Sequence, residues 1–212
     1  MNLALFDFDG TITTKETFAD FIHFAVPPVR LGMGKVLLAP LVIGYRTGRV
    51  SGNLMRGSAV RIGLAGMPVD RAQALGRRFA DEVLLGLQRP NVMSRIEWHK
   101  ARGDRVVVVS GALELYLAPW CERHGLELIC SRLEVREGRL TGSYAGNQCV
   151  ADEKARRVRE TIDTSLYEEI YAYGDTSDDF AMLRLAKHAD FRGRVWMDPE
   201  VRIDADILTR SE

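Results

Sequence analysis

Two acidic motifs stand far apart in the chain: Asp-Phe-Asp-Gly-Thr at residues 7–11 and Gly-Asp-Thr-Ser-Asp-Asp at residues 174–179. Each directly follows a short apolar run that is typical of a buried strand. The carboxyl ends of parallel strands meet at one crevice, so folding would bring these carboxylates together. Carboxylates this close need a counter-charge, and their oxygens suit Mg²⁺, with Lys154 as a second cation. The pattern predicts a site for a phosphate ester.

The first motif offers a nucleophile and a general acid. The Asp7 carboxylate can attack phosphorus and form an acyl-phosphate, which splits hydrolysis into two easier steps. Asp9, two residues on, can protonate the leaving oxygen and later deprotonate water. A lone Asp-x-Asp is equally compatible with a turn or a solvated pair. Its position after an apolar strand, with Gly10 and Thr11 following, favours the catalytic interpretation.

Three other positions could complete the site. Ser110 and Gly111 follow an apolar run and precede a helix, where a hydroxyl and backbone N–H groups can hold phosphate oxygens. The alternatives are a plain turn for this pair, a solvated side chain for Lys154, and N-capping by Asp175 or Asp178. Two further carboxylates within five residues of Asp175 favour a metal site.

The elements that must position these residues alternate between strand and helix. We expect strands at residues 3–6, 105–109, 126–130, 169–173 and within 189–196, and a hairpin over 132–144 that turns at Glu137-Gly138. We expect helices near residues 18–25 and over 35–45, 51–64, 68–87, 92–102, 113–124, 152–162 and 178–186. This order predicts an α/β fold, a three-layer Rossmann-like parallel sheet. Residues 1–15 and 91–212 would form the core, and residues 16–90 an inserted all-helical cap.

Composition narrows the classes of function. The chain has 212 residues, and Lys+Arg and Asp+Glu are both 29, so no basic field predicts nucleic-acid binding. Three cysteines without metal-ligand spacing predict a reducing, cytoplasmic compartment. The N-terminus leads at once into a strand, which is not the pattern of a signal peptide. The apolar stretch 36–45 is shorter than the roughly 20 residues that span a bilayer.

In this order the motifs resemble those of the haloacid dehalogenase superfamily. Residues 7–11 resemble its first motif, Ser110 its second, Lys154 its third, and Gly174-Asp175-x-x-x-Asp179 its fourth. A helical insertion after the first motif resembles the type-1 cap. The chain is most similar to the phosphoserine phosphatase-like branch, whose first motif is followed by an acidic residue, here Glu16.

The resemblance implies a Mg²⁺-dependent phosphatase. Asp7 would be the nucleophile, Asp9 the general acid and base and also a metal ligand through its carbonyl, and Asp175 a metal ligand. Asp179 would support the metal and its waters. Lys154 and Ser110 would stabilise the phosphoryl group, together with the backbone N–H groups near Gly10 and Gly111. Thr11 would orient the nucleophile or the phosphate.

The cap carries two further hypotheses. Arg56 or Arg61 could bind the rest of the substrate, or both could be surface residues on a basic helix face. A branch with an apolar cap includes phosphatases for phosphatidylglycerophosphate. Arg30, Lys35 and Arg46 flank the apolar stretch, an arrangement that suits a peripheral membrane contact on the inner face of a membrane. The alternative, which we favour from the sequence, makes residues 36–43 a buried helix of the cap.

The sequence therefore predicts a phosphomonoester hydrolase with an aspartyl-phosphate intermediate. Its substrate would be a small phosphorylated metabolite similar to phosphoserine, or a phospholipid head group. Two alternatives stay open: a phosphotransferase, in which a second hydroxyl accepts the phosphoryl group, and a non-catalytic protein that binds a phosphorylated ligand. The oligomeric state and the pathway are also left open.

Overall fold

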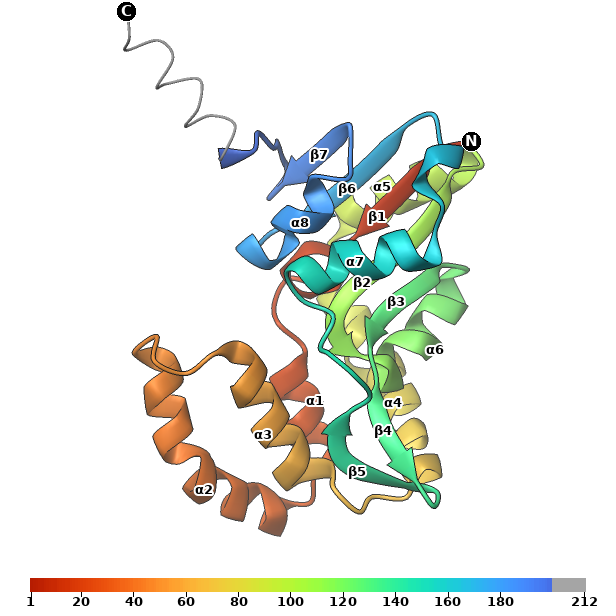
Figure 1. The fold of residues 1–212 in the computed structure, drawn as a ribbon. Helices are drawn as coiled ribbons and strands as arrows, with labels where there is room; N and C mark the ends of the chain where they lie inside the picture. The colour runs from red at the N-terminus through yellow and green to blue at the C-terminus, as the bar shows by residue number, and fades with distance from the viewer. Residues whose placement is uncertain (200–212) are drawn as a thin grey trace, which may run out of the picture.

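A six-stranded sheet forms the centre of the computed structural model, which describes residues 1–199 (Figure 1). The strand order is β3-β2-β1-β6-β7-β8, and all neighbours are parallel except the antiparallel pair β7 and β8. The strands are β1 (Leu3–Phe6), β2 (Arg105–Leu113), β3 (Glu127–Ser131), β6 (Ile170–Gly174), β7 (His188–Phe191) and β8 (Arg194–Val195). β1 lies between β2 and β6, so the topology reverses beside it, and a crevice is expected at its carboxyl end.

Both faces of the sheet are covered by helices. Side chains alternate along β1: Phe6 packs with Ile96 of α5 (Pro90–Ala101) and Leu117 of α6 (Glu114–His124) on one face. Leu5 belongs to the second cluster, with Val158 of α7 (Asp152–Thr161) and Met182 of α8 (Phe180–Leu183). The predicted three-layer α/β fold is confirmed.

A helical cap is inserted between β1 and α5. It contains α1 (Phe18–Ala25), α2 (Pro28–Arg46), α3 (Gly52–Leu64), α4 (Val69–Glu82) and the short turn η2 (Leu84–Leu87). The chain enters and leaves the cap side by side, because the Thr14 N–H donates to the Leu87 carbonyl at 2.8 Å and the Arg89 N–H to the Ile12 carbonyl at 2.8 Å. In Figure 1 the cap lies beyond the carboxyl ends of the parallel strands.

The predicted hairpin is present as β4 (Leu133–Arg136) and β5 (Arg139–Tyr144). Its turn residues Glu137 and Gly138 both have positive φ, the backbone that a tight hairpin turn requires. The hairpin reaches the cap, since the Val69 N–H donates to the Gly138 carbonyl at 2.9 Å. Cap and core also meet where α4 lies against α6 with Gly76 at the contact.

Two expectations about elements were wrong at their ends. β2 continues through Ser110 and Gly111 to Leu113, with a register shift against β3 instead of a break. The predicted helix 178–186 is the turn η4 (Ser177–Asp179) followed by the short α8. Two further turns, η1 (Phe8–Ile12) and η3 (Thr164–Leu166), complete the elements of the described chain. Residues 200–212, which we assigned to the core, lie outside the described residues.

The largest correction concerns the apolar stretch of the cap. It belongs to α2, which starts at Pro28 and has 19 residues, long and apolar enough by length and composition alone to cross a bilayer. The favoured expectation of a buried helix was wrong. Gly34 is the only buried residue of this fully described helix, and Val36 and Ile43 are exposed.

Candidate active site

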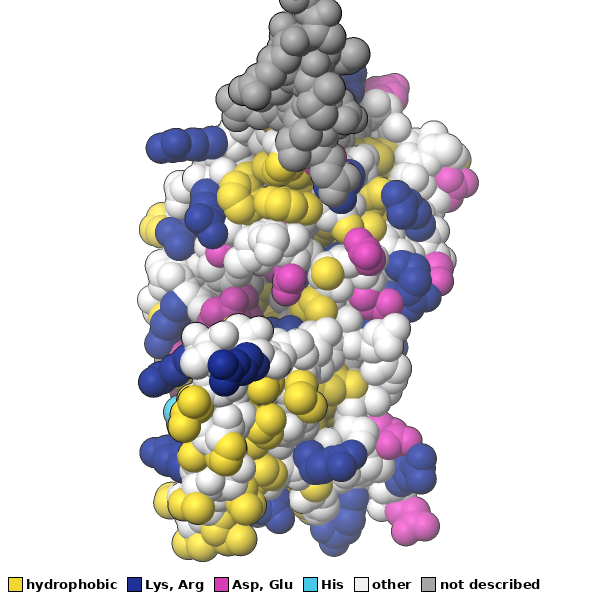
Figure 2. Space-filling model, turned by 60° about the vertical axis from the view of Figure 1, so that its left-hand side comes forward, with side chains coloured by type: hydrophobic (Ala, Val, Ile, Leu, Met, Phe, Trp, Pro, Cys, Tyr) yellow, Lys and Arg dark blue, Asp and Glu magenta, His cyan; other side chains and the backbone are white. Residues whose placement is uncertain are grey.

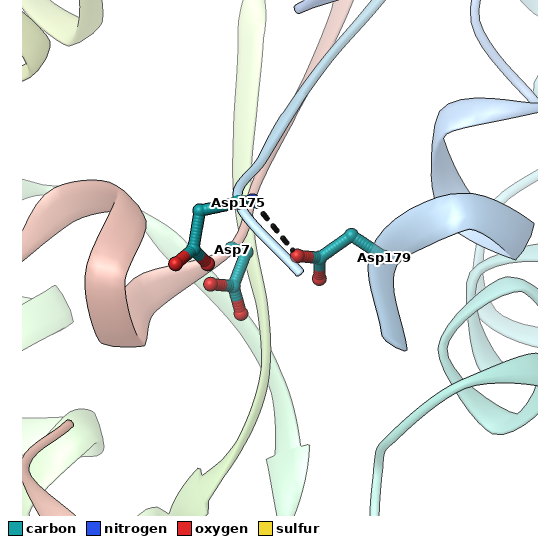
Figure 3. A group of neighbouring side chains, drawn as sticks. All are labelled: Asp7, Asp175 and Asp179. Carbon is teal, nitrogen blue, oxygen red and sulfur yellow. Dashed lines mark hydrogen bonds between the residues drawn. The ribbon is translucent and has the colours of Figure 1, made fainter. Parts of the chain in front are cut away.

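The two acidic motifs meet at the crevice beside β1. Asp7 directly follows β1, and its N–H donates to the carbonyl of Tyr173 in β6 at 2.9 Å. Asp175 follows β6. Figure 3 shows the carboxylates of Asp7 and Asp175 turned toward each other, with Asp179 approaching from the start of α8. One oxygen from each of these three residues lies within 4.8 Å of the others. The parallel register of the two strands therefore places the carboxylates together, as the sequence predicted.

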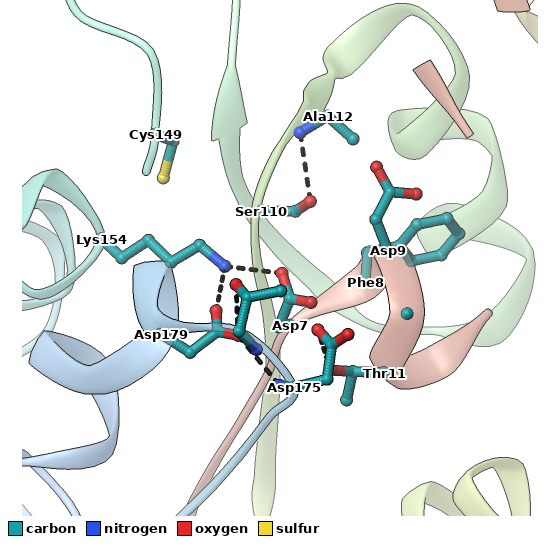
Figure 4. A network of polar contacts seen from close by, with 12 residues as sticks. Asp7, Phe8, Asp9, Thr11, Ser110, Ala112, Cys149, Lys154, Asp175 and Asp179 are labelled. Atoms are coloured by element: carbon teal, nitrogen blue, oxygen red, sulfur yellow. Dashed lines mark hydrogen bonds and ion pairs between the residues drawn. The ribbon is translucent and has the colours of Figure 1, made fainter. Parts of the chain in front are cut away.

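Lys154 supplies the counter-charge. Its ammonium donates to Asp7 Oδ1 at 2.5 Å and to Asp179 Oδ1 at 2.6 Å (Figure 4). All three side chains are buried. Burial lowers the pKa of Lys154, but the two carboxylates outweigh it and hold the pKa above its ordinary value. The two carboxylates therefore keep Lys154 in its charged form.

Burial also acts on the carboxylates. It raises the pKa of Asp7 well above its ordinary value, against the lowering effect of Lys154. The pKa of Asp175 is raised by burial and by the Asp179 carboxylate. Three carboxylates share one ammonium, so the fully ionised cluster carries two uncompensated negative charges. A divalent cation with oxygen ligands would balance them, so the donor set fits Mg²⁺.

The loop after β6 fixes Asp179. Its Oδ2 accepts the backbone N–H groups of Asp175 and Thr176, both at 3.0 Å. A Cβ at Gly174 would lie 2.5 Å from the Asp179 Cβ, so a side chain there would displace this carboxylate. Asp179 is therefore held by backbone donors on one oxygen and by Lys154 on the other, whereas Asp178 is exposed.

Gly10 permits the close approach between the two motifs. Its φ is +78°, and a Cβ there would lie 2.2 Å from Asp175 Oδ2. Only glycine combines this conformation with this contact. The Thr11 hydroxyl donates to Asp175 Oδ1 at 3.3 Å, which orients Asp175.

The Asp9 side chain points away from Asp7, Asp175 and Asp179 (Figure 4). It accepts the N–H of Thr17 at 3.0 Å and the Thr17 hydroxyl at 2.6 Å. Burial, together with the nearby Glu16 carboxylate, raises the pKa of Asp9 to about 7. Near neutral pH this carboxyl can therefore both donate and accept a proton, the property that a general acid and base requires.

A small cavity of about 50 Å³ connects these groups. The residues that line it are Asp7, Asp9, Glu16, Phe18, Arg56, Ser110, Gly111, Ala112, Val150, Lys154, Thr176 and Asp178. Ser110 is buried and accepts the Ala112 N–H at 3.1 Å. The cavity therefore brings residues of both acidic motifs together with Lys154 and Ser110.

Of the two predicted arginines, only Arg56 lines this cavity; Arg61 is exposed on α3. Arg56 Nε donates to Gln148 Oε1 at 2.8 Å, and its NH2 group to Asn53 Oδ1 at 2.8 Å.

Gln148 was missed by sequence reasoning, since its role comes from a contact across 92 residues. Phe18 and Val150 were missed as well, and an apolar residue beside a motif gives no local signal of lining a site.

Comparison with known proteins agrees with this geometry. The family model for haloacid dehalogenase-like hydrolases matches residues 4–184, and the chain belongs to this family. It is therefore a phosphatase-like hydrolase and an enzyme.

Relatives with curated descriptions include Protein CicA of Caulobacter vibrioides, 35% identical over 90% of this chain and 85% of that protein. A probable phosphatase of Mycobacterium tuberculosis is 30% identical over 59% of this chain and 44% of its own length.

Solved structures with the same fold include a protein of unknown function from Bordetella pertussis. It has a TM-score of 0.76 and 22% identity, and the match covers 98% of this chain and 96% of that one. A substrate-bound phosphoserine phosphatase has a TM-score of 0.66 and 20% identity, with 97% of each chain covered.

Proposed function

We propose that this hydrolase is a Mg²⁺-dependent phosphatase that cleaves phosphate monoesters through an aspartyl-phosphate on Asp7. The observation that carries the proposal is the buried cluster of Asp7, Asp175, Asp179 and Lys154 at the crevice, beside a carboxyl of raised pKa. The phosphatase names of the Mycobacterium relative and of the phosphoserine phosphatase structure also support it.

In the first step, an oxygen of Asp7 attacks phosphorus as the bond from phosphorus to the leaving oxygen breaks. Asp9 gives its proton to that leaving oxygen. In the second step, Asp9 takes a proton from water, and the water oxygen attacks phosphorus. The bond between phosphorus and the Asp7 oxygen breaks, which releases inorganic phosphate and the free carboxylate.

The remaining residues stabilise charge. Lys154, the Ser110 hydroxyl and the backbone N–H groups near Gly10 and Gly111 would bind the phosphoryl oxygens, where negative charge develops. Asp7, the Asp9 carbonyl and Asp175 would hold Mg²⁺, supported by Asp179. The ion would supply positive charge at the phosphoryl oxygens.

The proposed substrate is a phosphate monoester. It is either a small soluble metabolite similar to phosphoserine or the head group of a phospholipid. Arg56, fixed by Gln148 and Asn53 at the cavity, would bind a second anionic group of the substrate. Glu16 and Thr11 would help to position it. The three buried thiols, Cys121, Cys130 and Cys149, support a reducing, cytoplasmic location.

We also propose that residues 16–90 act as a cap over a core of residues 1–15 and 91–212. The paired entry and exit of the chain, at residues 12–14 and 87–89, supports a boundary there. Arg56 and Phe18 line the cavity from the cap side, so movement of the cap would open the site and determine which esters enter.

The test is phosphate release from p-nitrophenyl phosphate, phosphoserine, sugar phosphates and phosphatidylglycerophosphate, each with Mg²⁺ and with EDTA. Wild type should release phosphate only with Mg²⁺. Asp7→Asn should reduce turnover by about 10³-fold or more and retain the circular dichroism of wild type. Asp152→Asn, an exposed carboxylate on α7, is the control.

Asp7→Asn turnover near that of wild type would refute the nucleophile. Transfer of phosphate to an added alcohol in place of water would identify a phosphotransferase. No release from any ester by folded, Mg²⁺-bound protein would favour a binding protein.

A further inference from the structure

One face of α2 is apolar and uncovered. Its side chains recur every three or four residues, so they form a stripe along one side of the helix. The stripe consists of Val29 (79% exposed), Met33 (60%), Val36 (76%), Leu37 (60%) and Ile43 (64%), with Pro40 between them. The opposite side packs on the cap, where Gly34 lies against Ile62 of α3. A helix that is apolar on both sides normally has a partner on both.

An apolar groove of about 420 Å³ runs beside this stripe, between α2 and the helices α1 and α3. Leu31, Leu38 and Ile62 line it, and Arg30 and Lys35 also belong to its wall. The cap therefore combines an exposed apolar helix with an apolar groove that has cations at its edge. Figure 2 shows yellow side chains gathered over the cap in the lower part of this face, with dark blue side chains among and around them.

The charge of this part of the chain indicates what covers the stripe. Residues 21–69 contain six cations and no Asp or Glu, although the whole chain has 29 of each sign. The cations are Arg30, Lys35, Arg46, Arg49, Arg56 and Arg61, and all except the half-buried Arg56 are exposed. This segment therefore has a net charge of +6, and the rest of the chain −6.

We propose that α2 lies on the surface of an anionic lipid bilayer, with its stripe among the acyl chains and its cations at the head groups. Interfacial helices combine an apolar face with Lys and Arg that reach back to the phosphates. Lys35 and Arg46 flank the stripe on one side, and both are exposed. Arg30, on the other side, is exposed as well, but it donates to the carbonyls of Gly63 at 3.1 Å and Ala65 at 3.0 Å, at the end of α3. A second copy of the chain suits this face less well, because two segments of charge +6 would repel each other.

The geometry supports a helix that lies on the membrane in preference to one that spans it. Spanning would separate α2 from α3, and would take Arg30 and Lys35 into or across the hydrocarbon. The interfacial position keeps the packing of Gly34 against Ile62 and leaves the core unchanged.

The experiment is co-sedimentation of the full chain with vesicles of phosphatidylcholine alone, or of phosphatidylcholine that contains about a third phosphatidylglycerol, an anionic mixture. Wild type should bind the anionic vesicles more tightly, and added salt should weaken binding. The double substitution Val36→Ser and Leu37→Ser should weaken binding by about tenfold or more. Leu166→Ser, an equally exposed leucine on the core, should have no effect.

A charge variant provides an independent test. Lys35→Glu should reduce binding by about tenfold or more, because each cation near an anionic surface contributes roughly a factor of five and the substitution changes two charges. Arg159→Glu, on the exposed surface of α7, is the matched control. Neither substitution touches the catalytic cavity, so hydrolysis of p-nitrophenyl phosphate in solution should match wild type.

Failure to bind anionic vesicles, or unchanged binding by the serine variant, would overturn the proposal. So would light scattering that shows a wild-type dimer in lipid-free buffer and a monomer for the serine variant, because a second copy would then cover the stripe. If the wild-type protein did not hydrolyse p-nitrophenyl phosphate at all, that result would instead contradict the proposed function. The two failures are therefore distinguishable.

Discussion

At the scale of single residues, Lys154 has a proposed role in catalysis and a structural role in the crevice. It is buried between Asp7 and Asp179, two carboxylates that would be left without a cation if it were removed. Removing one partner from a buried ion pair costs more than the pair itself contributes, because a charge stays behind without compensation. The site is thus also part of what holds the crevice together.

We predict that Lys154→Met destabilises the protein by about 3 kcal/mol or more in metal-free buffer. Urea unfolding with EDTA present would measure the free energy of unfolding. The control is Arg156→Met on the same helix. Its exposed side chain pairs with Glu153 and Glu160, and these pairs should contribute less than about 1 kcal/mol. Equal losses in the two variants would contradict the role given to Lys154.

Sequence motifs located the acidic cluster because its members stand next to strand ends, and strand order brings those ends together. The same reasoning could not find Gln148, which contacts Arg56 only after the chain has folded. Nor could it choose between Arg56 and Arg61, which lie five residues apart on one helix. Which of the two faces the cavity depends on how α3 is rotated, and that is set by packing against β5 and α2.

At the scale of elements, the contact between α4 and α6 depends on Gly76. A Cβ there would lie 1.9 Å from the backbone carbonyl oxygen of Leu115, an atom that cannot move aside as a flexible side chain can. Gly57, inside α3, has nothing within 4 Å of the same position. Alanine substitutions at the two glycines therefore distinguish the cost of a steric clash from the gain in helix propensity.

We predict that Gly76→Ala destabilises the protein by about 1–3 kcal/mol, through overpacking. Gly57→Ala should stabilise it by roughly 0.5–1 kcal/mol, because alanine loses less backbone entropy in a helix. Thermal unfolding of both variants would measure the difference. A stabilising Gly76→Ala would show that α4 can move away from α6 without cost.

A buried polar chain ties α5 to the sheet. His99 Nδ1 lies 2.8 Å from Asp104 Oδ2, its Nε2 lies 2.9 Å from the Tyr173 hydroxyl, and Asn2 donates to Asp104 at 2.9 Å. Burial lowers the pKa of His99, against the effect of Asp104. Burial opposes ionisation of Asp104, but the hydrogen bonds from His99 and Asn2 outweigh it and lower its pKa.

This predicts a pH dependence of stability. Because the folded pKa of His99 is below the unfolded value of about 6.5, the unfolded chain binds the extra proton, and stability falls as pH decreases below that value. The free energy of unfolding of wild type should exceed that of His99→Gln by less and less as the pH falls from about 7.5 to 5. Urea unfolding across this range would measure it, with His23→Gln, at an exposed position of α1, as the control. A constant difference would contradict a buried neutral imidazole.

Most elements were predictable from periodicity, but several boundaries were not. The first cap helix ends at Ala25 as expected, but the next one was expected to begin at residue 35 and begins at Pro28, because a proline in the first turn of a helix costs no hydrogen bond. β2 runs past Ser110 because β3 continues to pair with it, and that pairing has no local signal.

At the scale of the whole molecule, the fold class followed from the order of strands and helices, but the surroundings of α2 did not. An apolar helix in a sequence is normally taken as buried, since burial is what apolar surface favours. Here the chain has no other element to cover the stripe within the described residues, and only the structure reveals this.

We predict that Mg²⁺ stabilises the whole molecule. A ligand that binds only the folded state adds about 2.7 kcal/mol at a hundred times its Kd, so Tm should rise as Mg²⁺ is added. Asp175→Ala should abolish most of this rise. Asp178→Ala, which removes the exposed neighbouring carboxylate outside the triad, should keep it. The same rise in both variants would refute the ligand role of Asp175.

The separation of charge between residues 21–69 and the rest of the chain has a consequence for how the molecule meets a charged surface. With equal numbers of the two signs it feels almost no net force from a distance, but its opposite ends are pulled in opposite directions. It therefore behaves as a large electric dipole and rotates in the field before it is attracted. An anionic surface would meet the cap first, with the orientation set before contact.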